Sequence, residues 1–505
     1  MEILNSIFSW VMKKRIHQIE LFLKYPNEVQ REIFNKLITT AKDTEFGKEH
    51  GFSGIKNLKD FKKNIPIRNY EQLYPYIEKL LRGEQQILWP SDVNWFAKSS
   101  GTTNDRSKFI PVTDEALEDC HFKGGKDMMS IYLDNFPESK VFSGKGLTVG
   151  GSHKINKFDK NSKSYYGDVS AVIIKNLPFW THIRKTPSSD IALMSNWEEK
   201  IEKMAKFTSE ENVTSIFGVP TWTIVLIKRI LELKNARHIL EVWPNLELFV
   251  HGAVSFVPYR KLFSEMIPSR NMNYVETYNA SEGFFGIQDQ KHSDELLLML
   301  DYGIYYEFIP YKNLDDENPP ALELDEVELG VNYAMVISTN AGLWRYKIGD
   351  TVKFTSKNPY RIKITGRTKH FINAFGEELI IENAEMGIAK ACERTGAIVS
   401  DYTAGPIYFS QGSKGGHEWI IEFKKQPKDL TRFINILDGA MRKLNSDYDA
   451  KRYKNIALVA PRVHQVEDGT FYNWMKKRKK LGGQNKVPRL VNNRIYLEDL
   501  LQFVN

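Results

Sequence analysis

The sequence predicts an α/β protein with a large N-terminal domain and a smaller α+β domain at its C-terminal end. Short apolar runs alternate with helical stretches from Gly146 onward, which is typical of a mostly parallel sheet with right-handed crossovers. A β-rich subdomain is predicted from Leu300 to Phe354, and a shorter strand–helix unit begins beyond Gly366. Since 505 residues are too many for one ordinary core, we expect a large domain over residues 1–366 and a small mobile domain over residues 367–505.

Each element is predicted from its own periodicity. Residues 1–41 carry apolar side chains near helical spacing, and Met1–Lys14 is predicted to be an amphipathic helix that packs on the body. Apolar runs predict strands at 146–149, 213–217, 246–250 and 273–277. Helices are predicted between them at 197–207, 222–233 and 259–266. In the small domain, helices are expected at 381–395 and 429–444, and strands at 402–411 and 419–424.

The composition excludes several classes of protein. A hydrophobic share of 42% with 26% charged residues is that of a globular chain, and a net charge of +7 permits anionic substrates without arguing for nucleic acid. Cys120 and Cys392 cannot build a disulfide framework or a zinc cluster, which fits a reducing cytosol. No run of about eighteen apolar residues occurs, so no membrane span is predicted. We expect a cytoplasmic monomer or weak homodimer.

A hydroxyl-rich run, Lys98-Ser99-Ser100-Gly101-Thr102-Thr103, is the most informative stretch of the chain. Small hydroxyl residues around a glycine let backbone N–H and side-chain O–H groups converge on one anion. Lys108 and Pro111 close the stretch and add a nearby cation. The run therefore predicts a phosphate site, and its alternative is a solvated Ser/Thr turn.

Small and polar residues follow three of the predicted strands. They are Gly218-Val219-Pro220, His251-Gly252-Ala253 and Tyr278-Asn279-Ala280-Ser281-Glu282-Gly283. Because ligands in open α/β sheets bind beyond the carboxyl ends of strands, these residues stand where a ligand is expected.

Two of these regions carry nucleotide-binding chemistry. Tyr278 can stack on a base, Ser281 can donate to a phosphate, and Glu282 can hold a Mg²⁺ that bridges phosphates. The alternative is a turn whose tyrosine packs in the core. Asp350, which follows Gly349, can accept both ribose hydroxyls, and its alternative is an ordinary Gly-Asp turn.

Cations near the C-terminal end offer further contacts. Arg367 is either a surface cation or a sugar or phosphate contact. Lys486 follows two glycines, so it can bring a positive charge to a transferring phosphate and then leave; its alternative is a solvated lysine. The basic run Lys476–Lys480 is read as a solvated helix face.

Missing motifs narrow the chemistry. The sequence has no Walker A lysine pattern and no His-Glu-x-x-His zinc site. Asn279–Gly283 lacks only the first glycine of a Gly-x-Ser-x-Gly nucleophile elbow, which keeps a Ser281 hydrolase as a rival interpretation.

Taken together, these segments resemble the adenylate-forming superfamily, and more narrowly the auxin-responsive Gretchen Hagen family of acyl-acid amido synthetases in its bacterial branch. The resemblance covers nearly the whole chain, because six motifs occur in the family's order. They are Thr44–Gly47, Ser99–Thr103, Tyr278–Gly286, Tyr346–Asp350, Leu444–Tyr448 and Gln484–Arg489. The run Thr103–Ser107 departs from the plant pattern, and the plant specificity residues find no match, so the acyl substrate stays open.

The resemblance implies an adenylate-forming fold and an ATP site. Ser99, Ser100, Gly101, Thr102 and Thr103, with Lys108, would hold the phosphates. Gly252 and Ala253 would line the adenine, Tyr278 would stack on it, and Asn279 would be a further ATP-binding residue. Ser281 would bind the α-phosphate, Glu282 the Mg²⁺, and Asp350 the ribose, with Arg367 close by. Lys486 would come from the small domain as a catalytic residue.

The implied reaction is that of a ligase. A small carboxylic acid is adenylated with release of pyrophosphate, and an amino acid amine then takes the acyl group and releases AMP. Phe179, Trp180, Trp222 and Phe256 are candidates for an apolar acyl pocket, although core packing explains any one of them. Transfer to coenzyme A or a protein thiol, and a catalytically silent module that senses a small acid, are the alternatives.

Overall fold

The computed structural model describes residues 15–99, 108–150, 156–157, 163–177, 184–194, 196–253, 256, 259–314, 316–367, 371–372, 379–407, 415–445, 448–449, 452, 458–481, 487–491 and 494–504. Its internal contacts divide the chain into two compact units. Unit 1 comprises Met1–Ala253 and Ser269–Ile364, and unit 2 comprises Val254–Pro268 and Thr365–Asn505. The two predicted domains, and the mobility of the small one, remain predictions.

Unit 1 is built on one eleven-stranded sheet. In spatial order its strands are β12 (Ile304–Pro310), β13 (Asn332–Thr339), β14 (Tyr346–Lys357), β15 (Tyr360–Arg367), β11 (Leu296–Leu298), β10 (Gly283–Ile287), β9 (Asn273–Ala280), β8 (Leu248–Gly252), β7 (Val213–Gly218), β3 (Lys145–Val149) and β6 (Lys185–Thr186). The five strands from β9 to β6 run parallel to their neighbours, while β9–β10, β10–β11 and β12–β13 are antiparallel pairs. The expected mixed α/β fold is confirmed, and its β-rich segment continues the same sheet.

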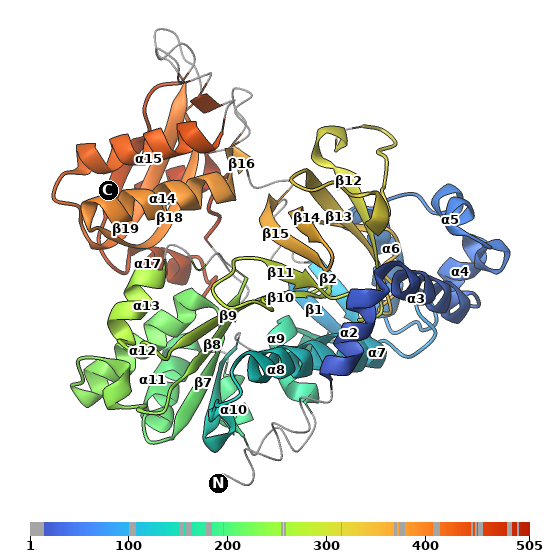
Figure 1. The fold of residues 1–505 in the computed structure, drawn as a ribbon, viewed down its shortest axis with the longest axis horizontal. Coiled ribbons are helices and arrows are strands. Elements are labelled where there is room, and N and C mark those ends of the chain that lie inside the picture. Colours follow the sequence, from blue (N-terminus) through green and yellow to red (C-terminus); the bar gives the residue numbers. More distant parts are fainter. Residues whose placement is uncertain are drawn as a thin grey trace. The chain divides into compact units, whose positions relative to one another are not determined.

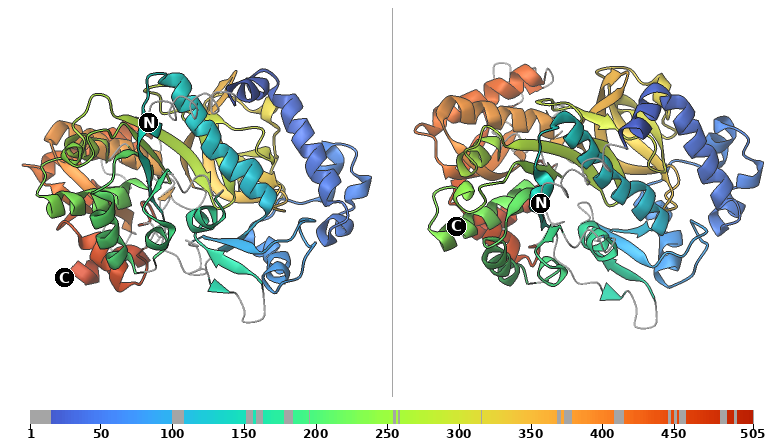
Figure 2. Two further views of the ribbon diagram at one scale, coloured as in Figure 1. Left: turned by 90° about the horizontal axis from the view of Figure 1, so that it is seen from below. Right: turned by 60° about the horizontal axis from the view of Figure 1, so that its bottom comes forward.

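Helices accompany this sheet along the chain. Pro26 opens α3 at a position where its missing N–H costs no hydrogen bond, and α3 packs against β12 (Figures 1 and 2). The Asn196 side chain caps α11 (Trp197–Thr208) by accepting from the Glu199 N–H. The helices of unit 1 are α2 (Ile16–Lys24), α3 (Pro26–Ala41), α4 (Glu45–Glu49), α5 (Leu58–Asn64), α6 (Tyr70–Leu81), α7 (Asp114–Ala116), the π-helix Leu117–Phe122, α8 (Lys123–Asn135), α9 (Val169–Asn176), α10 (Ser189–Ala192), α11 (Trp197–Thr208) and α12 (Pro220–Lys234), with short 3₁₀ turns at Phe52–Gly54, Val141–Ser143, Ile239–Glu241, Tyr311–Asn313 and Leu324–Glu326.

A second, four-stranded sheet in unit 1 has no counterpart in the sequence prediction. Its order is β2 (Lys108–Val112), β1 (Trp95–Ser99), β5 (Tyr165–Gly167) and β4 (Asn156–Lys157). β1 and β2 are antiparallel, and Ser99 pairs with Lys108. The strands on either side of the hydroxyl-rich run are therefore paired at the points where the run begins and ends.

Unit 2 contains the predicted helices and strands of the C-terminal region. Its three-stranded sheet has the order β18 (Ile398–Ile407), β19 (Gly416–Lys425) and β20 (Arg462–Val466), and β16 (Phe371–Ile372) pairs with β17 (Leu379–Ile380). The helices are α13 (Arg260–Met266), α14 (Ile381–Thr395), α15 (Leu430–Leu444), α17 (Thr470–Lys477) and α18 (Ile495–Val504), and α14 packs along α15 (Figure 1). Across the described ranges of both units, no helix has the length and apolar character that a membrane span requires.

Candidate functional site

The carboxyl ends of β8 and β9 form the first part of the candidate site. Gly252 ends β8 and pairs with Thr277 of β9. A Cβ atom at position 252 would lie 2.3 Å from the Thr277 carbonyl oxygen, so only glycine fits there. Ala253 then adopts a left-handed backbone with φ of 71°, which is costly for a residue with a side chain. The turn is therefore held in a strained form at the edge where a ligand is expected.

The hairpin between β9 and β10 carries the next two predicted residues. Ala280 pairs with Gly283, so Ser281 and Glu282 form a two-residue turn. Ser281 is buried, and Glu282 is half-buried. This tight turn fixes the positions of a hydroxyl and a carboxylate relative to the end of β9.

A buried hydrogen bond joins Tyr278 to Asp350. The Tyr278 hydroxyl donates to Asp350 Oδ2 at 2.6 Å, and the two residues are 5% and 7% exposed. The Tyr278 ring packs against Phe285 with a centroid distance of 4.8 Å. Gly349, with φ of 92°, supplies the left-handed backbone that β14 needs just before Asp350. Two residues that lie 72 positions apart in the sequence thus meet at one side of the sheet.

Lys108 brings a positive charge to the same strand as Asp350. Its ammonium group donates to the Tyr346 hydroxyl at 3.5 Å and lies 5.6 Å from the centre of the Tyr70 ring. Burial raises the pKa of Tyr346 well above its ordinary value, and the negative charge of Glu282 raises it further. Tyr346 therefore stays a neutral phenol that accepts the Lys108 hydrogen bond.

Other predicted residues lie on separate elements. Trp222 is buried on α12 of unit 1, whereas Phe256 is buried in unit 2, where its ring lies 5.2 Å from that of Phe263. Ser99 ends β1 and Arg367 ends β15. The predictions for Ser100, Gly101, Thr102, Thr103, Phe179, Trp180 and Lys486 fall outside the described residues.

The structure also places a residue near the site that sequence reasoning missed. His121 lies in the π-helix Leu117–Phe122, a rare form of helix that often occurs at functional sites. Burial lowers its pKa to about 4, and the neighbouring Asn279 side chain raises it by less. His121 is therefore neutral at pH 7 and stands beside the Tyr278–Gly283 segment. Its neighbours in the sequence include Glu118, Asp119 and Lys123, so no local pattern marks it as buried.

The described residues fit a nucleotide with a metal ion held mainly by phosphates. No group of three or more His, Cys, Asp or Glu side chains within the described parts of the chain could hold a metal alone. Mg²⁺ that bridges phosphates needs one or two protein carboxylates, and Glu282, in the two-residue turn of its hairpin, could supply one. Asp350 supplies an acceptor for hydroxyl groups, and Lys108 supplies a cation.

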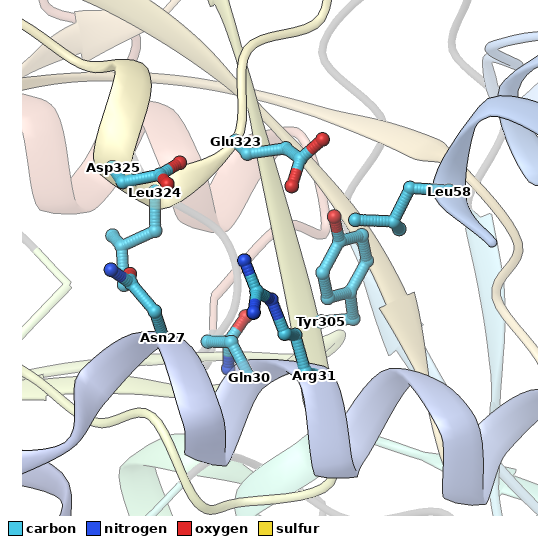
Figure 3. A pocket seen from close by; sticks show the side chains of 8 residues that line it. All are labelled: Asn27, Gln30, Arg31, Leu58, Tyr305, Glu323, Leu324 and Asp325. Atoms are coloured by element: carbon cyan, nitrogen blue, oxygen red, sulfur yellow. The ribbon is translucent and has the colours of Figure 1, made fainter.

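A small cavity in unit 1 is separate from these residues (Figure 3). Arg31 points into it from α3, and Tyr305 faces it from β12 (Figure 3). Its volume of about 20 Å³ is that of a single water site and far too small for a nucleotide. The full lining is Asn27, Gln30, Arg31, Leu58, Tyr305, Glu323, Leu324 and Asp325.

Comparison with known proteins identifies relatives along nearly the whole chain. Residues 15–272 match the GH3 family N-terminal domain, residues 297–367 the GH3 family central domain, and residues 382–495 the GH3 family C-terminal domain. Indole-3-acetic acid-amido synthetase GH3.3 of Arabidopsis thaliana is 23% identical, with 95% of this chain and 92% of the relative covered. Jasmonoyl–L-amino acid synthetase JAR4 of Nicotiana attenuata is 25% identical, with 94% and 93% covered. The solved structure of GH3.15 acyl acid amido synthetase has the same fold, with a TM-score of 0.80, 17% identity, and 97% and 96% covered.

Proposed function

Because the chain belongs to the GH3 (Gretchen Hagen) family, we propose that it joins a small carboxylic acid to an amino acid in two half-reactions that consume ATP. It is an acid–amino acid ligase of the adenylate-forming superfamily. One relative is named for indole-3-acetic acid and another for the jasmonoyl group. Because these two names differ, neither identifies the acid that this protein uses. The bacterial branch, the cytoplasmic location and a monomeric or weakly dimeric state are parts of the same proposal.

In the first half-reaction, a carboxylate oxygen of the acid attacks the α-phosphorus of ATP. The bond from that phosphorus to the bridging oxygen breaks, and pyrophosphate leaves. In the second, the amino acid nitrogen attacks the activated carbonyl carbon, loses a proton, and displaces AMP. No protein nucleophile is needed, so the protein's main task is to place the reactants and stabilise developing charge.

The described residues have distinct tasks in this scheme. Asp350 is assigned to the ribose hydroxyls, in place of or beside the Tyr278 hydroxyl that it accepts in this structure. Lys108 faces the phosphates together with the hydroxyl-rich run, because Lys108 pairs with Ser99 at the start of that run. Gly252 and Ala253 are assigned to the adenine, at the end of β8. Tyr278, Asn279 and Ser281 complete the nucleotide side.

Two residues are assigned to catalysis. Glu282 would hold Mg²⁺, which neutralises phosphate charge when it is bound. Lys486 would bring a positive charge to the oxygens around the reacting phosphorus, where negative charge increases in the transition state. Arg367 is proposed as a further sugar or phosphate contact. Trp222, Phe179 and Phe256 remain candidates for the acyl pocket.

The observation that carries the proposal is the buried Tyr278–Asp350 bond, with Lys108 on Tyr346 of the same strand as Asp350. This arrangement places a hydroxyl acceptor and a cation within a chain that matches the three GH3 domains in order. A Ser281 hydrolase is disfavoured, because Ser281 lies in a two-residue hairpin turn and not between a strand and a helix.

A matrix of acids and amino acids, screened for AMP release with product identification by mass spectrometry, tests the proposal. We expect AMP release that requires both an acid and an amino acid, with a product whose mass is their sum minus water. Lys486→Ala and Glu282→Ala should each lower the rate by about a hundredfold or more. Lys479→Ala, which removes an exposed lysine of unit 2, is the matched control and should leave the rate unchanged.

Coenzyme A replaces the amino acid in a second arm of the screen. A thioester formed in preference to an amide would overturn the amide assignment and favour the alternative acyl acceptor. Nucleotide binding without acid-dependent AMP release would indicate a silent binding module.

A further inference from the structure

In unit 2, one buried arginine joins three separate segments of the chain. Arg489 is 8% exposed, and its guanidinium donates to the Asp401 carboxylate, to the Tyr402 carbonyl at 3.1 Å, and to the Tyr259 hydroxyl. Asp401 and Tyr402 belong to β18, whereas Tyr259 directly precedes α13. Since a guanidinium carries its five donors in a rigid plane, these partners fix its orientation.

The backbone on either side of Arg489 is held to β18 as well. The Ala404 N–H donates to the Arg489 carbonyl at 2.9 Å, and the Val491 N–H donates to the Ala404 carbonyl at 3.0 Å. The Thr403 hydroxyl donates to the Pro488 carbonyl at 2.6 Å. The described segment Val487–Val491 is thus fixed along β18, and it begins directly after Lys486.

Tyr259 extends this anchoring to another part of the chain. It is fully enclosed in unit 2, and burial raises the pKa of its hydroxyl above the ordinary range. The hydroxyl therefore stays neutral and accepts a hydrogen bond from a permanently charged group. Tyr259 stands six residues after Ala253, so the segment that it anchors is the continuation of the strained turn at the end of β8.

The three contacts have different roles. Asp401 neutralises the buried charge of Arg489, and the Tyr402 carbonyl satisfies another donor within β18. The bond to Tyr259 adds no charge balance, and it connects two segments that the sequence separates by 230 positions. A connection of this kind constrains geometry more than it compensates a charge.

We propose that Arg489 is a positioning residue, which holds the segment following Lys486 to the segment following the Gly252–Ala253 turn through its bond to Tyr259. The catalytic meaning of this contact rests on the proposed function, because both segments continue from residues assigned to ATP. The physical contact itself can be tested without any assumption about the reaction.

Two tyrosine variants from the same cluster provide a matched pair. Tyr259→Phe removes only the hydroxyl that Arg489 contacts. Tyr402→Phe removes a buried hydroxyl that hydrogen-bonds to no described residue, while its ring stays 4.6 Å from the guanidinium. Both changes delete one oxygen atom within the same cluster, so a general effect of the substitution would appear in both variants.

The kinetic arm measures acid-dependent exchange of pyrophosphate into ATP. For Tyr259→Phe we expect a fall of about tenfold in turnover, as for the loss of one hydrogen bond to a charged group. KM values for ATP and the acid should stay within about twofold, and the melting temperature within about 2 °C, since the Asp401 pair is intact. Tyr402→Phe should match the wild type. If the Tyr259–Arg489 bond were only structural, Tyr259→Phe would instead lower the melting temperature and the turnover together.

The physical arm measures hydrogen exchange of the Val491 amide and its neighbours by mass spectrometry. We expect exchange about tenfold faster in Tyr259→Phe than in the wild type, and no change in Tyr402→Phe. Equal exchange in the two variants would overturn the proposal. A wild-type protein that shows no acid-dependent exchange of pyrophosphate would refute the proposed function, and the amide measurement would then still decide whether Arg489 holds the two segments.

Discussion

Two buried tyrosine hydroxyls, one in each unit, face opposite charges. In unit 1 Tyr278 donates a hydrogen bond to the carboxylate of Asp350, and in unit 2 Tyr259 accepts one from the guanidinium of Arg489. The carboxylate of unit 2, Asp401, is paired with that same guanidinium. Arg489 and Asp401 of unit 2 therefore balance each other's charge, whereas the hydrogen bond from Tyr278 brings no charge to Asp350 in unit 1. Under the proposed function, this difference separates the structural anchor of unit 2 from a carboxylate of unit 1 that is assigned to a ligand's hydroxyl groups.

The largest effect is expected where the charge balance is broken in unit 2. Arg489→Met should lower the free energy of unfolding by about 3–5 kcal/mol, because Asp401 is left buried without its cation. Denaturant unfolding, followed by a probe within unit 2, measures this loss. The double variant Arg489→Met with Asp401→Asn should recover part of it, and a double variant as unstable as the single one would contradict the pairing.

A smaller effect of another kind is expected in unit 1. Asp350→Asn keeps the shape of the side chain and an oxygen for Tyr278, so stability should change by less than about 1 kcal/mol. KM for ATP should rise by about thirtyfold, since hydrogen bonds to a charged acceptor are the stronger ones. Steady-state kinetics at varied ATP concentration provide the measurement. If Asp350→Asn instead lowers the free energy of unfolding as far as Arg489→Met does, Asp350 is a structural residue and does not differ in role from the Arg489 cluster of unit 2.

The smallest effect concerns a second acid of unit 2. Glu422, in β19, accepts the Phe471 N–H at 2.8 Å, and burial raises its pKa to about 7, with the charge of Asp401 adding to the shift. The stability that comes from this raised pKa is complete below about pH 4.5 and is lost as the pH rises through 7. Glu422→Gln never ionises, so at pH 8 it should exceed the wild type by about 1–2 kcal/mol.

Melting temperatures at pH 5 and pH 8 test this expectation. The advantage of Glu422→Gln should be present at pH 8 and absent at pH 5. If the difference in melting temperature between Glu422→Gln and the wild type is the same at pH 5 and pH 8, the surroundings of Glu422 do not raise its pKa.

Local sequence patterns locate the end of one strand but not of the other two. Gly252 ends β8, whereas Tyr278 lies inside β9 (Asn273–Ala280) and β14 continues past Asp350 to Lys357, so neither Tyr278 nor Asp350 stands in a turn after its strand. The bond between Tyr278 and Asp350 was not predictable, because nothing in the sequence around either residue specifies which side chain, 72 positions away, it will face.

Other features depend on contacts that no short pattern records. The β-rich stretch continues the main sheet because β15 pairs with β11, and the strand ends alone do not reveal that pairing. His121 acquires its neutral state from burial in a π-helix. In the sequence, nothing distinguishes Arg489 from an ordinary cation near Lys486. Only the fold shows that its guanidinium is enclosed between Asp401 and Tyr259.

The position of β9 in the sheet has a mechanical consequence. This strand pairs in parallel with β8, which ends at Gly252, and antiparallel with β10, which begins just after Glu282. A displacement of β8 or of β10 therefore acts on the same eight residues of β9, which pair with both strands. Substitutions beside the Gly252–Ala253 turn should therefore perturb the Ser281–Glu282 hairpin without touching it, and crystallographic displacements of the two turns should increase and decrease together.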